Sequence, residues 1–214
     1  MICPLCGGVG ATPFHRDPNR DYLRCATCLL VFVPPEQRPS PERERAEYDL
    51  HDNRLDDPAY RRFLSRVFTP MQQRLPPGSL GLDFGCGPAP ALVAMFEEGG
   101  HTMARFDAFY FPGLAPLSST YDFITATEVI EHLHHPGAEL ERLWSLLRPG
   151  GCLGLMTQPV LDRARFKSWR YIQDVTHVCF FSQATFAWLG MRWGVVPEFV
   201  GRDVVLFSKP GGAA

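Results

Sequence analysis

The sequence predicts an α/β protein with a doubly wound, mostly parallel sheet and a small cysteine-rich module at its N-terminus. Two observations predict the sheet: an apolar strand at 80–84 runs through a glycine turn into a helix, and a second short strand follows at 101–106. A strand, a turn, a helix and another strand form the first unit of a parallel α/β sheet. The third observation is a double pair of cysteines within residues 3–28, which predicts the module.

The composition is that of an ordinary globular protein. A chain of 214 residues, 45% of them hydrophobic and 21% charged, can bury one full-sized core and still carry a small appendage. Its formal net charge of −2 attracts neither nucleic acid nor an anionic membrane. With no signal peptide and no apolar run that could cross a bilayer, we expect a cytoplasmic protein without a membrane partner. In that reducing compartment the seven cysteines are metal ligands or buried residues, not disulfides.

The cysteine pairs predict a structural zinc site. Two Cys-x2-Cys turns, separated by eighteen residues, supply Cys3, Cys6, Cys25 and Cys28. Thiolates three positions apart can grip one ion from a tight turn, and two such turns complete a tetrahedral four-sulfur site. Because sulfur fills all four positions, none is left open for catalysis. The alternative is four free cysteines packed under the main domain.

The boundaries follow from composition. We expect a zinc ribbon at 1–34, a proline-rich and charged linker at 35–57, the main domain at 58–208 and a tail at 209–214. Apolar residues at helical spacing predict an entry helix that begins at Pro58 and closes before Pro76–Gly78.

The glycine turn after the first strand predicts a small-molecule site. Gly85 and Gly87 let the backbone approach a ligand where a Cβ atom would collide. The dinucleotide fingerprint requires a third glycine, and Pro90 stands there instead. Asp83 just before the turn favours a ligand with a cationic amino group over one with a pyrophosphate. Asp107, at the end of the second strand, is placed to bind ribose hydroxyls.

Four segments in this order resemble the class I S-adenosylmethionine-dependent methyltransferases, over roughly residues 45–208. They are LDFGCGPAP at 82–90, Asp107, YDFITATEVIEHLHHP at 121–136 and LRPGGCLGLMT at 147–157. The resemblance implies a Rossmann-like fold, with strands at 121–127 and 152–157 and a turn at 148–151. It also implies an antiparallel hairpin of 195–199 and 204–207 that closes the sheet.

The resemblance also implies the cofactor and its contacts. Asp83, Gly85 and Gly87 would hold the methionine part of S-adenosylmethionine, and Asp107 its ribose. The other implied contacts are Cys86, Ala108, Thr127 and Glu128.

One segment departs from the family pattern. Only thirteen residues separate Asp107 from Tyr121, too few for the usual helix and third strand. We therefore expect the sheet to lack a strand at that edge, and the aromatic residues 109–111 to line the adenine pocket.

An acid–histidine cluster is the candidate catalytic site. Glu128, Glu131 and His132 are spaced to share one face of a helix after the fourth strand, and His177 lies 45 residues further along the chain. In one interpretation these residues only line the pocket and support other groups. In a second, similar to small-RNA 2′-O-methyltransferases and quinone-pathway O-methyltransferases, all four bind Mg or Mn and activate a substrate hydroxyl. In a third, His132 or His177 is a general base. We take Glu131, His132 and His177 as the catalytic candidates.

Three functions follow from these observations. We expect a methyltransferase whose partner is a small-molecule substrate, such as a sugar or another metabolite with a hydroxyl group. The first alternative is an RNA methyltransferase that docks through the zinc ribbon, although the mixed charges of the ribbon loop do not favour nucleic acid. The second is a non-catalytic cofactor-binding scaffold. The sequence specifies neither the acceptor atom nor the oligomeric state.

Overall fold

The structure is a computed structural model that describes residues 1–50 and 54–212. The chain divides into two compact units. We call the first the ribbon unit; it comprises Met1–Leu50, Ile130–Glu141 and Thr157–Val196. The second, which we call the sheet unit, comprises the described residues of three segments, 54–129, 142–156 and 197–212. Residues 51–53 of the expected linker and 213–214 of the expected tail lie outside the described residues.

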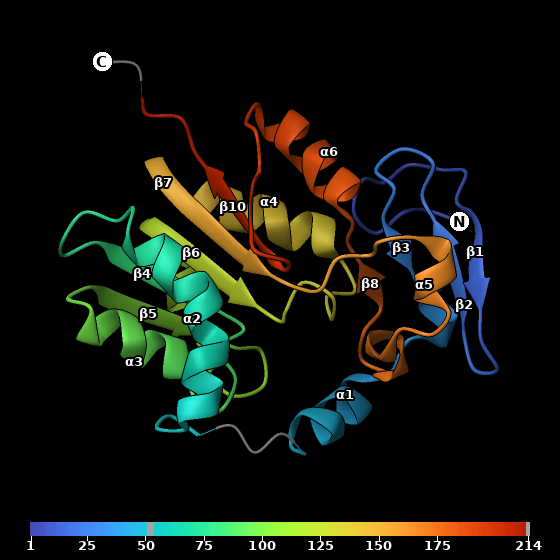
Figure 1. The fold of residues 1–214 in the computed structure, drawn as a ribbon, viewed down its shortest axis with the longest axis horizontal. Coiled ribbons are helices and arrows are strands. Elements are labelled where there is room, and N and C mark those ends of the chain that lie inside the picture. Colours follow the sequence, from blue (N-terminus) through green and yellow to red (C-terminus); the bar gives the residue numbers. More distant parts are fainter. Residues whose placement is uncertain (51–53, 213–214) are drawn as a thin grey trace. The chain divides into compact units, whose positions relative to one another are not determined.

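The ribbon unit is built on a small antiparallel sheet (Figure 1). In the described chain its strands follow the order β1 (Thr12–Arg16), β2 (Asp21–Arg24), β3 (Val31–Phe32) and β8 (Cys179–Phe180). Aromatic side chains fill its core together with Leu30, Val31 and Val33. Phe166 packs edge-on against Tyr22 and Phe180, with ring centroids 5.1 and 5.3 Å apart. The cysteine-rich segment therefore shares a core with residues from much later in the sequence.

Short helices complete the ribbon unit. They are η1 (Pro35–Gln37), α1 (Pro41–Tyr48), α5 (Arg163–Phe166), η3 (Arg170–Gln173) and α6 (Gln183–Trp193). The expected linker thus contains η1 and α1. The side chain of Ser40 caps α1, and Pro41 suits the first turn, where no backbone N–H is needed. The predicted cap of α6 is confirmed, since the Ser182 side chain accepts from the Thr185 N–H.

The sheet unit contains the predicted mostly parallel sheet. Among the described residues its strand order is β5-β4-β6-β7-β10-β9, with β4, β5, β6 and β7 parallel and an antiparallel β9–β10 hairpin at one edge. The strands are β4 (Leu80–Phe84), β5 (Thr102–Phe106), β6 (Tyr121–Thr127), β7 (Leu147–Met156), β9 (Glu198–Val200) and β10 (Val204–Ser208).

The expected absence of a strand between β5 and β6 is confirmed. The described residues between β5 and β6 contain the 3-10 turn η2 (Ala115–Ser118) and an isolated bridge from Asp107 to Phe111, but no strand of the sheet. β5 therefore forms the edge of the sheet. The loop after β5 folds back on itself there, because Asp107 and Phe111 exchange two backbone hydrogen bonds of 3.2 and 3.0 Å.

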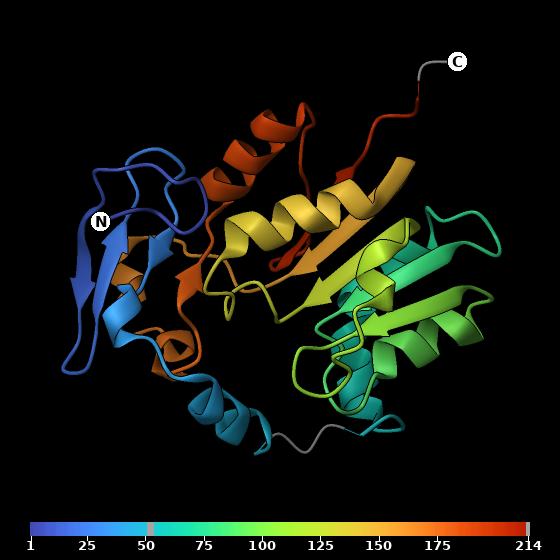
Figure 2. The ribbon, with the colours of Figure 1, turned by 180° about the vertical axis from the view of Figure 1, so that it is seen from behind.

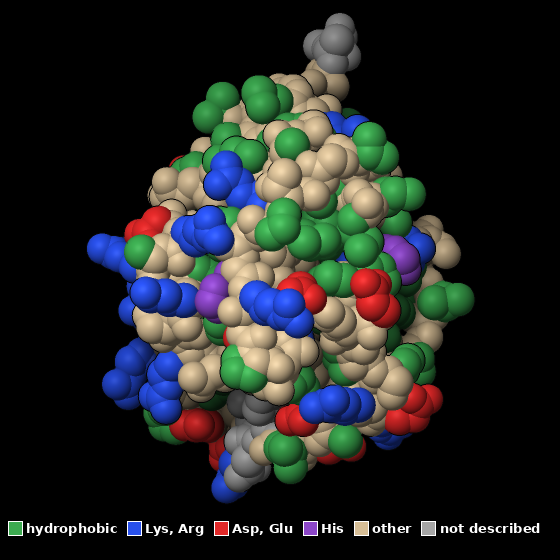
Figure 3. Space-filling view, turned by 90° about the vertical axis from the view of Figure 1, so that its right-hand side faces the viewer, with side chains coloured by type: hydrophobic (Ala, Val, Ile, Leu, Met, Phe, Trp, Pro, Cys, Tyr) green, Lys and Arg blue, Asp and Glu red, His purple; other side chains and the backbone are tan. Residues whose placement is uncertain are grey.

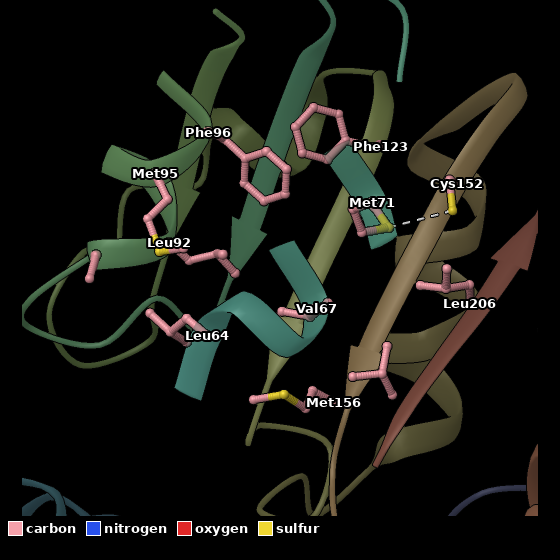
Figure 4. Packing of buried hydrophobic residues seen from close by; sticks show 12 residues of the cluster. Leu64, Val67, Met71, Leu92, Met95, Phe96, Phe123, Cys152, Met156 and Leu206 are labelled. Carbon is pink, nitrogen blue, oxygen red and sulfur yellow. Dashed lines mark hydrogen bonds between the residues drawn. The ribbon is translucent and has the colours of Figure 1, made fainter. Parts of the chain in front are cut away.

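Helices cover both faces of this sheet. α2 (Pro58–Gln72) and α3 (Ala91–Glu98) lie on one face. The part of α4 (Pro136–Leu146) that belongs to this unit, residues 142–146, lies on the other (Figures 1 and 2). The predicted start of α2 at Pro58 is confirmed, with Asp57 as its cap. Val67 and Met71 of α2 pack with Phe96 of α3 over the strands (Figure 4). No described helix is long and apolar enough to cross a membrane.

Three local expectations were wrong. Residues 128–135 form turns, and the helix begins only at Pro136, whose fixed φ suits a first helical turn. Glu128, Glu131 and His132 therefore share no helix face. β7 starts at Leu147, and the expected turn at 148–151 is an irregularity within that strand. The first hairpin strand starts at Glu198, directly after Pro197, and not at 195.

Candidate active site and metal centre

The four paired cysteines converge. Cys3 Sγ lies 3.5 Å from Cys28 Sγ, and Cys6 Sγ lies 3.5 Å from Cys25 Sγ. All four sulfur atoms lie within 4.8 Å of one another. Zinc–sulfur bonds of about 2.3 Å in a tetrahedron separate the sulfurs by roughly 3.8 Å, so the cluster is compatible with one zinc ion.

The backbone of each turn supports the sulfur atoms. The Gly8 N–H donates to Cys6 Sγ and the Thr27 N–H to Cys25 Sγ, at 3.3 and 3.4 Å. A Cβ atom on Gly8 would lie 3.1 Å from Cys6 Sγ, so glycine lets the chain pass this close. A hydrogen bond from the Cys28 thiol lowers the pKa of Cys3 to about 5. Burial raises the pKa of Cys6 to about 11, and the hydrogen bond to Cys3 raises that of Cys28, so within this cluster the thiolate, the form that binds metal, is favoured at Cys3.

In the sheet unit, the glycine loop joins the ends of two strands. The Gly85 N–H donates to the carbonyl oxygen of Phe106 at 2.7 Å, and the Gly87 N–H donates to Asp107 Oδ2 at 2.9 Å. Gly85 and Gly87 have φ angles of +76° and +65°. A Cβ atom on Gly85 would lie 2.4 Å from Val129 Cγ2. Only glycine fits there, in conformation and in space.

Asp107 organises the loop that follows β5. Its Oδ1 accepts from the backbone N–H groups of Phe109 and Tyr110, at 2.9 and 3.0 Å, while Oδ2 accepts from Gly87. A carboxylate can accept about four hydrogen bonds, so these three leave little capacity for ribose hydroxyls. Ala108 is exposed in the same turn. The structure thus gives Asp107 a loop-shaping role that the sequence did not predict.

Asp83 is buried beneath the loop. Its exposed fraction is 4%, and the Thr125 hydroxyl donates to its Oδ1 at 2.8 Å. Burial, with a smaller contribution from the charge of Asp107, raises the pKa of Asp83 to about 7. An adjacent cation would favour its ionised form. Burial also raises the pKa of the Cys86 thiol, which makes Cys86 a poor nucleophile.

The carboxyl end of β6 carries two further candidates. Thr127 Oγ1 is buried and has no hydrogen-bond partner within the part of the chain that the structure describes. Glu128 has a φ of +51°, a strained value for a residue with a side chain, and its N–H donates to the Met156 carbonyl at 2.8 Å. Strained backbone and an unsatisfied buried hydroxyl are typical of a ligand site. With the glycine loop and buried Asp83, these residues fit a ligand that has polar and cationic groups.

The predicted catalytic residues gather in the ribbon unit. Glu131, His132 and His177 each offer a ligand atom, and these three atoms lie within 4.8 Å of one another. Glu131 is fully buried and His177 is 6% exposed, whereas His132 is half-buried. The two imidazole rings are 4.6 Å apart, centroid to centroid. Glu131 and His132 lie on one turn, and the segment that precedes β8 brings His177 beside them.

Sequence similarity identifies the family. A family model described as "Methyltransferase domain" matches residues 53–195, about two thirds of the chain. The chain belongs to this family. It is a class I S-adenosylmethionine-dependent methyltransferase, in accord with its sheet order and glycine loop.

Solved structures of methyltransferases share the fold. One is the Burkholderia thailandensis 1,6-didemethyltoxoflavin-N1-methyltransferase with bound 1,6-didemethyltoxoflavin and S-adenosylhomocysteine. It is 18% identical with a TM-score of 0.58, and the match covers 92% of this chain and 99% of that one. Another is an O-methyltransferase family protein from the same organism, 12% identical with a TM-score of 0.52, where the match covers 79% of this chain and 64% of that one. No curated protein matches the sequence.

Two groups in the methyltransferase were missed by sequence reasoning. The Tyr171 hydroxyl donates to Glu131 and lies 3.0 Å from Thr157 Oγ1. Asp174 Oδ2 lies 3.7 Å from His177 Nε2, and Thr176 donates to Asp174 Oδ1 through both its N–H and its hydroxyl. Asp174 precedes His177 by three positions, a spacing that could have marked it. No sequence spacing marks Tyr171, because it lies 40 residues after Glu131 and contacts it only in the folded protein.

Proposed function

We propose that this methyltransferase methylates a hydroxyl group of a small molecule. The observation that carries the proposal is the pair of imidazoles beside buried Glu131. Nδ1 of His132 and Nδ1 of His177 face carbonyl oxygens, of Thr176 at 3.2 Å and Tyr171 at 2.7 Å. A carbonyl oxygen only accepts, so both Nδ1 atoms carry hydrogen and both Nε2 atoms carry the lone pair of a base.

The sheet unit would hold the cofactor. S-adenosylmethionine supplies an electrophilic methyl group when bound. Asp83 would bind its amino group, the Gly85–Gly87 loop its methionine part and Thr127 a polar atom. Asp107 would shape the loop and reach the ribose with its remaining acceptor capacity. Cys86, Ala108 and Glu128 would complete the contacts.

The proton of the acceptor would be taken in the ribbon unit. An alcohol must lose its proton as it attacks, whereas a neutral amine attacks through its own lone pair. A base is therefore most useful for an oxygen acceptor. Nε2 of His177 would accept the proton, and Asp174 at 3.7 Å would stabilise the resulting imidazolium. Glu131 would fix the second histidine or the acceptor hydroxyl.

In a second version of the proposal, the same residues bind a divalent ion. Glu131, His132 and His177 offer one carboxylate and two imidazoles within 4.8 Å, a suitable donor set for Mn or another divalent transition metal. An ion there would lower the pKa of the acceptor hydroxyl. The four-cysteine zinc would stay structural, since it leaves no position for substrate.

A small acceptor is favoured over RNA. The toxoflavin-pathway neighbour acts on a small heterocycle, by its name. Of the three arginines in the ribbon loop, Arg16 pairs with Asp21 at 3.4 Å and Arg20 is buried, which leaves the exposed Arg24 to offer charge to a phosphate. A phosphate track needs exposed and unpaired cations.

Radiolabelled methyl transfer tests the proposal. The protein is incubated with methyl-labelled S-adenosylmethionine and either a pooled extract of small metabolites or total RNA. We expect label in the small-molecule pool, carried in an alkali-stable methyl ether. Label in RNA would support the docking alternative, and label in neither pool, with the cofactor bound, would support a scaffold.

A further inference from the structure

A cationic cavity lies in the ribbon unit, and none of the four paired cysteines lines it. Its volume is about 640 Å³, a size typical of small-molecule sites. Its lining includes four cations, Arg20, Arg38, Arg43 and Lys167, and one carboxylate, Asp17. Figure 3 shows the side of the molecule that carries β1, β2 and α5, where Lys and Arg side chains gather along one edge.

The cavity keeps an excess of positive charge. The Asp17 carboxylate lies near Arg20 and accepts from the Tyr22 hydroxyl and from two backbone N–H groups. Arg43 and Lys167 form no ion pair within the described residues. Arg38 donates through Nε to the carbonyl oxygen of Val33 and through Nη1 to that of His134. These bonds leave the N–H groups of Nη2 for a ligand. Within the part of the chain that the structure describes, three cations therefore stay without a carboxylate partner.

Arg20 holds one wall of the cavity in place. Its guanidinium is buried and donates to the carbonyl oxygens of Ile172, Asp174, Val175 and His177. These bonds fix one wall of the cavity without any carboxylate. A preformed wall lowers the entropy cost of binding a ligand.

Trp169 adds an aromatic surface to this lining. The indole is held in place, because Nε1 donates to Gln158 at 3.3 Å and the ring stacks on Tyr171 at 4.8 Å. Cations that line the same cavity as a fixed aromatic ring suit a ligand that has both a phosphate and a flat or apolar part.

We propose that this cavity binds a phosphorylated small molecule, with Arg38, Arg43 and Lys167 on the phosphate and Trp169 against the rest. The site is independent of the methyl-transfer proposal, since none of the glycine-loop residues and none of the catalytic candidates line it. Its occupant would also contact the segment 172–175 that Arg20 holds in place.

Calorimetry tests this site with phenyl phosphate, inorganic phosphate and phenol as probes, on the full chain at low salt. We expect phenyl phosphate to bind severalfold more tightly than inorganic phosphate, and phenol not to bind. The double variant Arg43→Ala with Lys167→Ala should weaken phenyl phosphate binding about tenfold or more, because two unpaired cations are lost. Binding should also weaken as salt is raised.

The matched control is Arg45→Ala with Arg165→Ala. These arginines lie on the same two segments, but pair with Asp49 and Asp162 and do not line the cavity. The control should bind as the wild type does. Equal losses in both double variants, or no binding of phenyl phosphate to the wild type, would overturn the proposal. Tighter binding of a short single-stranded RNA that depends on Arg43 and Lys167 would also overturn it.

Discussion

The Nδ1 atom of His177 lies 2.7 Å from the main-chain carbonyl oxygen of Tyr171. The side chain of the same tyrosine donates a hydrogen bond to Glu131. One residue thus sets the tautomer of the histidine and holds the buried carboxylate beside it. Because the histidine N–H is committed to Nδ1, the basic lone pair belongs to Nε2, which lies nearest to Asp174.

This arrangement predicts the effect of removing each imidazole. His132→Ala and His177→Ala should lower turnover by about 10²-fold or more, because a base or metal ligand is lost. The affinity for S-adenosylmethionine should stay nearly unchanged. Initial rates and calorimetry on the same preparations measure both quantities. His135→Ala is the control, since His135 is exposed in the same segment. Full turnover in both variants would make the cluster structural.

A chelator separates the base from the metal. If Glu131, His132 and His177 bind an activating ion, a chelator that spares the tighter four-cysteine zinc should abolish methyl transfer, and Mg or Mn should restore it. If turnover is unaffected by the chelator while both histidine variants are inactive, the imidazole acts as the base. The metal assignment would then be wrong.

Metal analysis tests the four-cysteine centre. Protein purified without chelator should carry about one zinc per chain, and Cys25→Ser with Cys28→Ser should lose it. That variant should also melt at a lower temperature, because the short ribbon gains folding energy from the metal. Cys86→Ser, which changes a cysteine of the glycine loop, should keep its zinc. Zinc retained by the double serine variant would contradict the assignment.

The buried carboxylate of Asp83 predicts a pH dependence. Its pKa of about 7 lies above the unfolded value near 4, so between these values the unfolded chain releases a proton that the native protein keeps. This group should therefore lower the free energy of unfolding as pH rises from about 4 to 7, by on the order of 2–4 kcal/mol.

Urea unfolding of the wild type and Asp83→Asn across that pH range measures the effect. The asparagine variant should lack this part of the pH dependence, so the stability difference between the two proteins changes with pH. Identical pH profiles for the two proteins would show that Asp83 titrates normally. In the wild type, S-adenosylmethionine should bind more tightly at pH 8 than at pH 6, because its ammonium group pairs with the ionised carboxylate.

The regular part of the fold followed from local pattern. The glycine turn after β4, the cap at Ser182 and the four paired cysteines each have a short-range physical cause, which the sequence displays. The shortened segment after Asp107 even predicted the absent strand. Sequence reasoning was sufficient for these features, although it misplaced the starts of α4, β7 and β9.

The remainder had one local cause and several that depend on distant parts of the chain. Helical spacing placed Glu128, Glu131 and His132 on one helix, yet the left-handed backbone at Glu128 and the late start of α4 at Pro136 produce turns. Tyr171 reaches Glu131 across 40 residues, and Arg20 reaches His177 across 157. No periodic pattern encodes such contacts, because they arise only when the ribbon unit folds around its aromatic core.

Binding of S-adenosylhomocysteine to Gly85→Ala tests the central claim most directly. The added Cβ would lie 2.4 Å from Val129 Cγ2 on a backbone with φ of +76°. The control is Gly201→Ala, where φ is +63° but nothing lies within 4 Å of the added atom. Calorimetry should give one-to-one binding to the wild type and to Gly201→Ala, and at least tenfold weaker binding to Gly85→Ala. Absence of binding to the wild type, or equal affinity in Gly85→Ala, would contradict a cofactor site at the glycine loop.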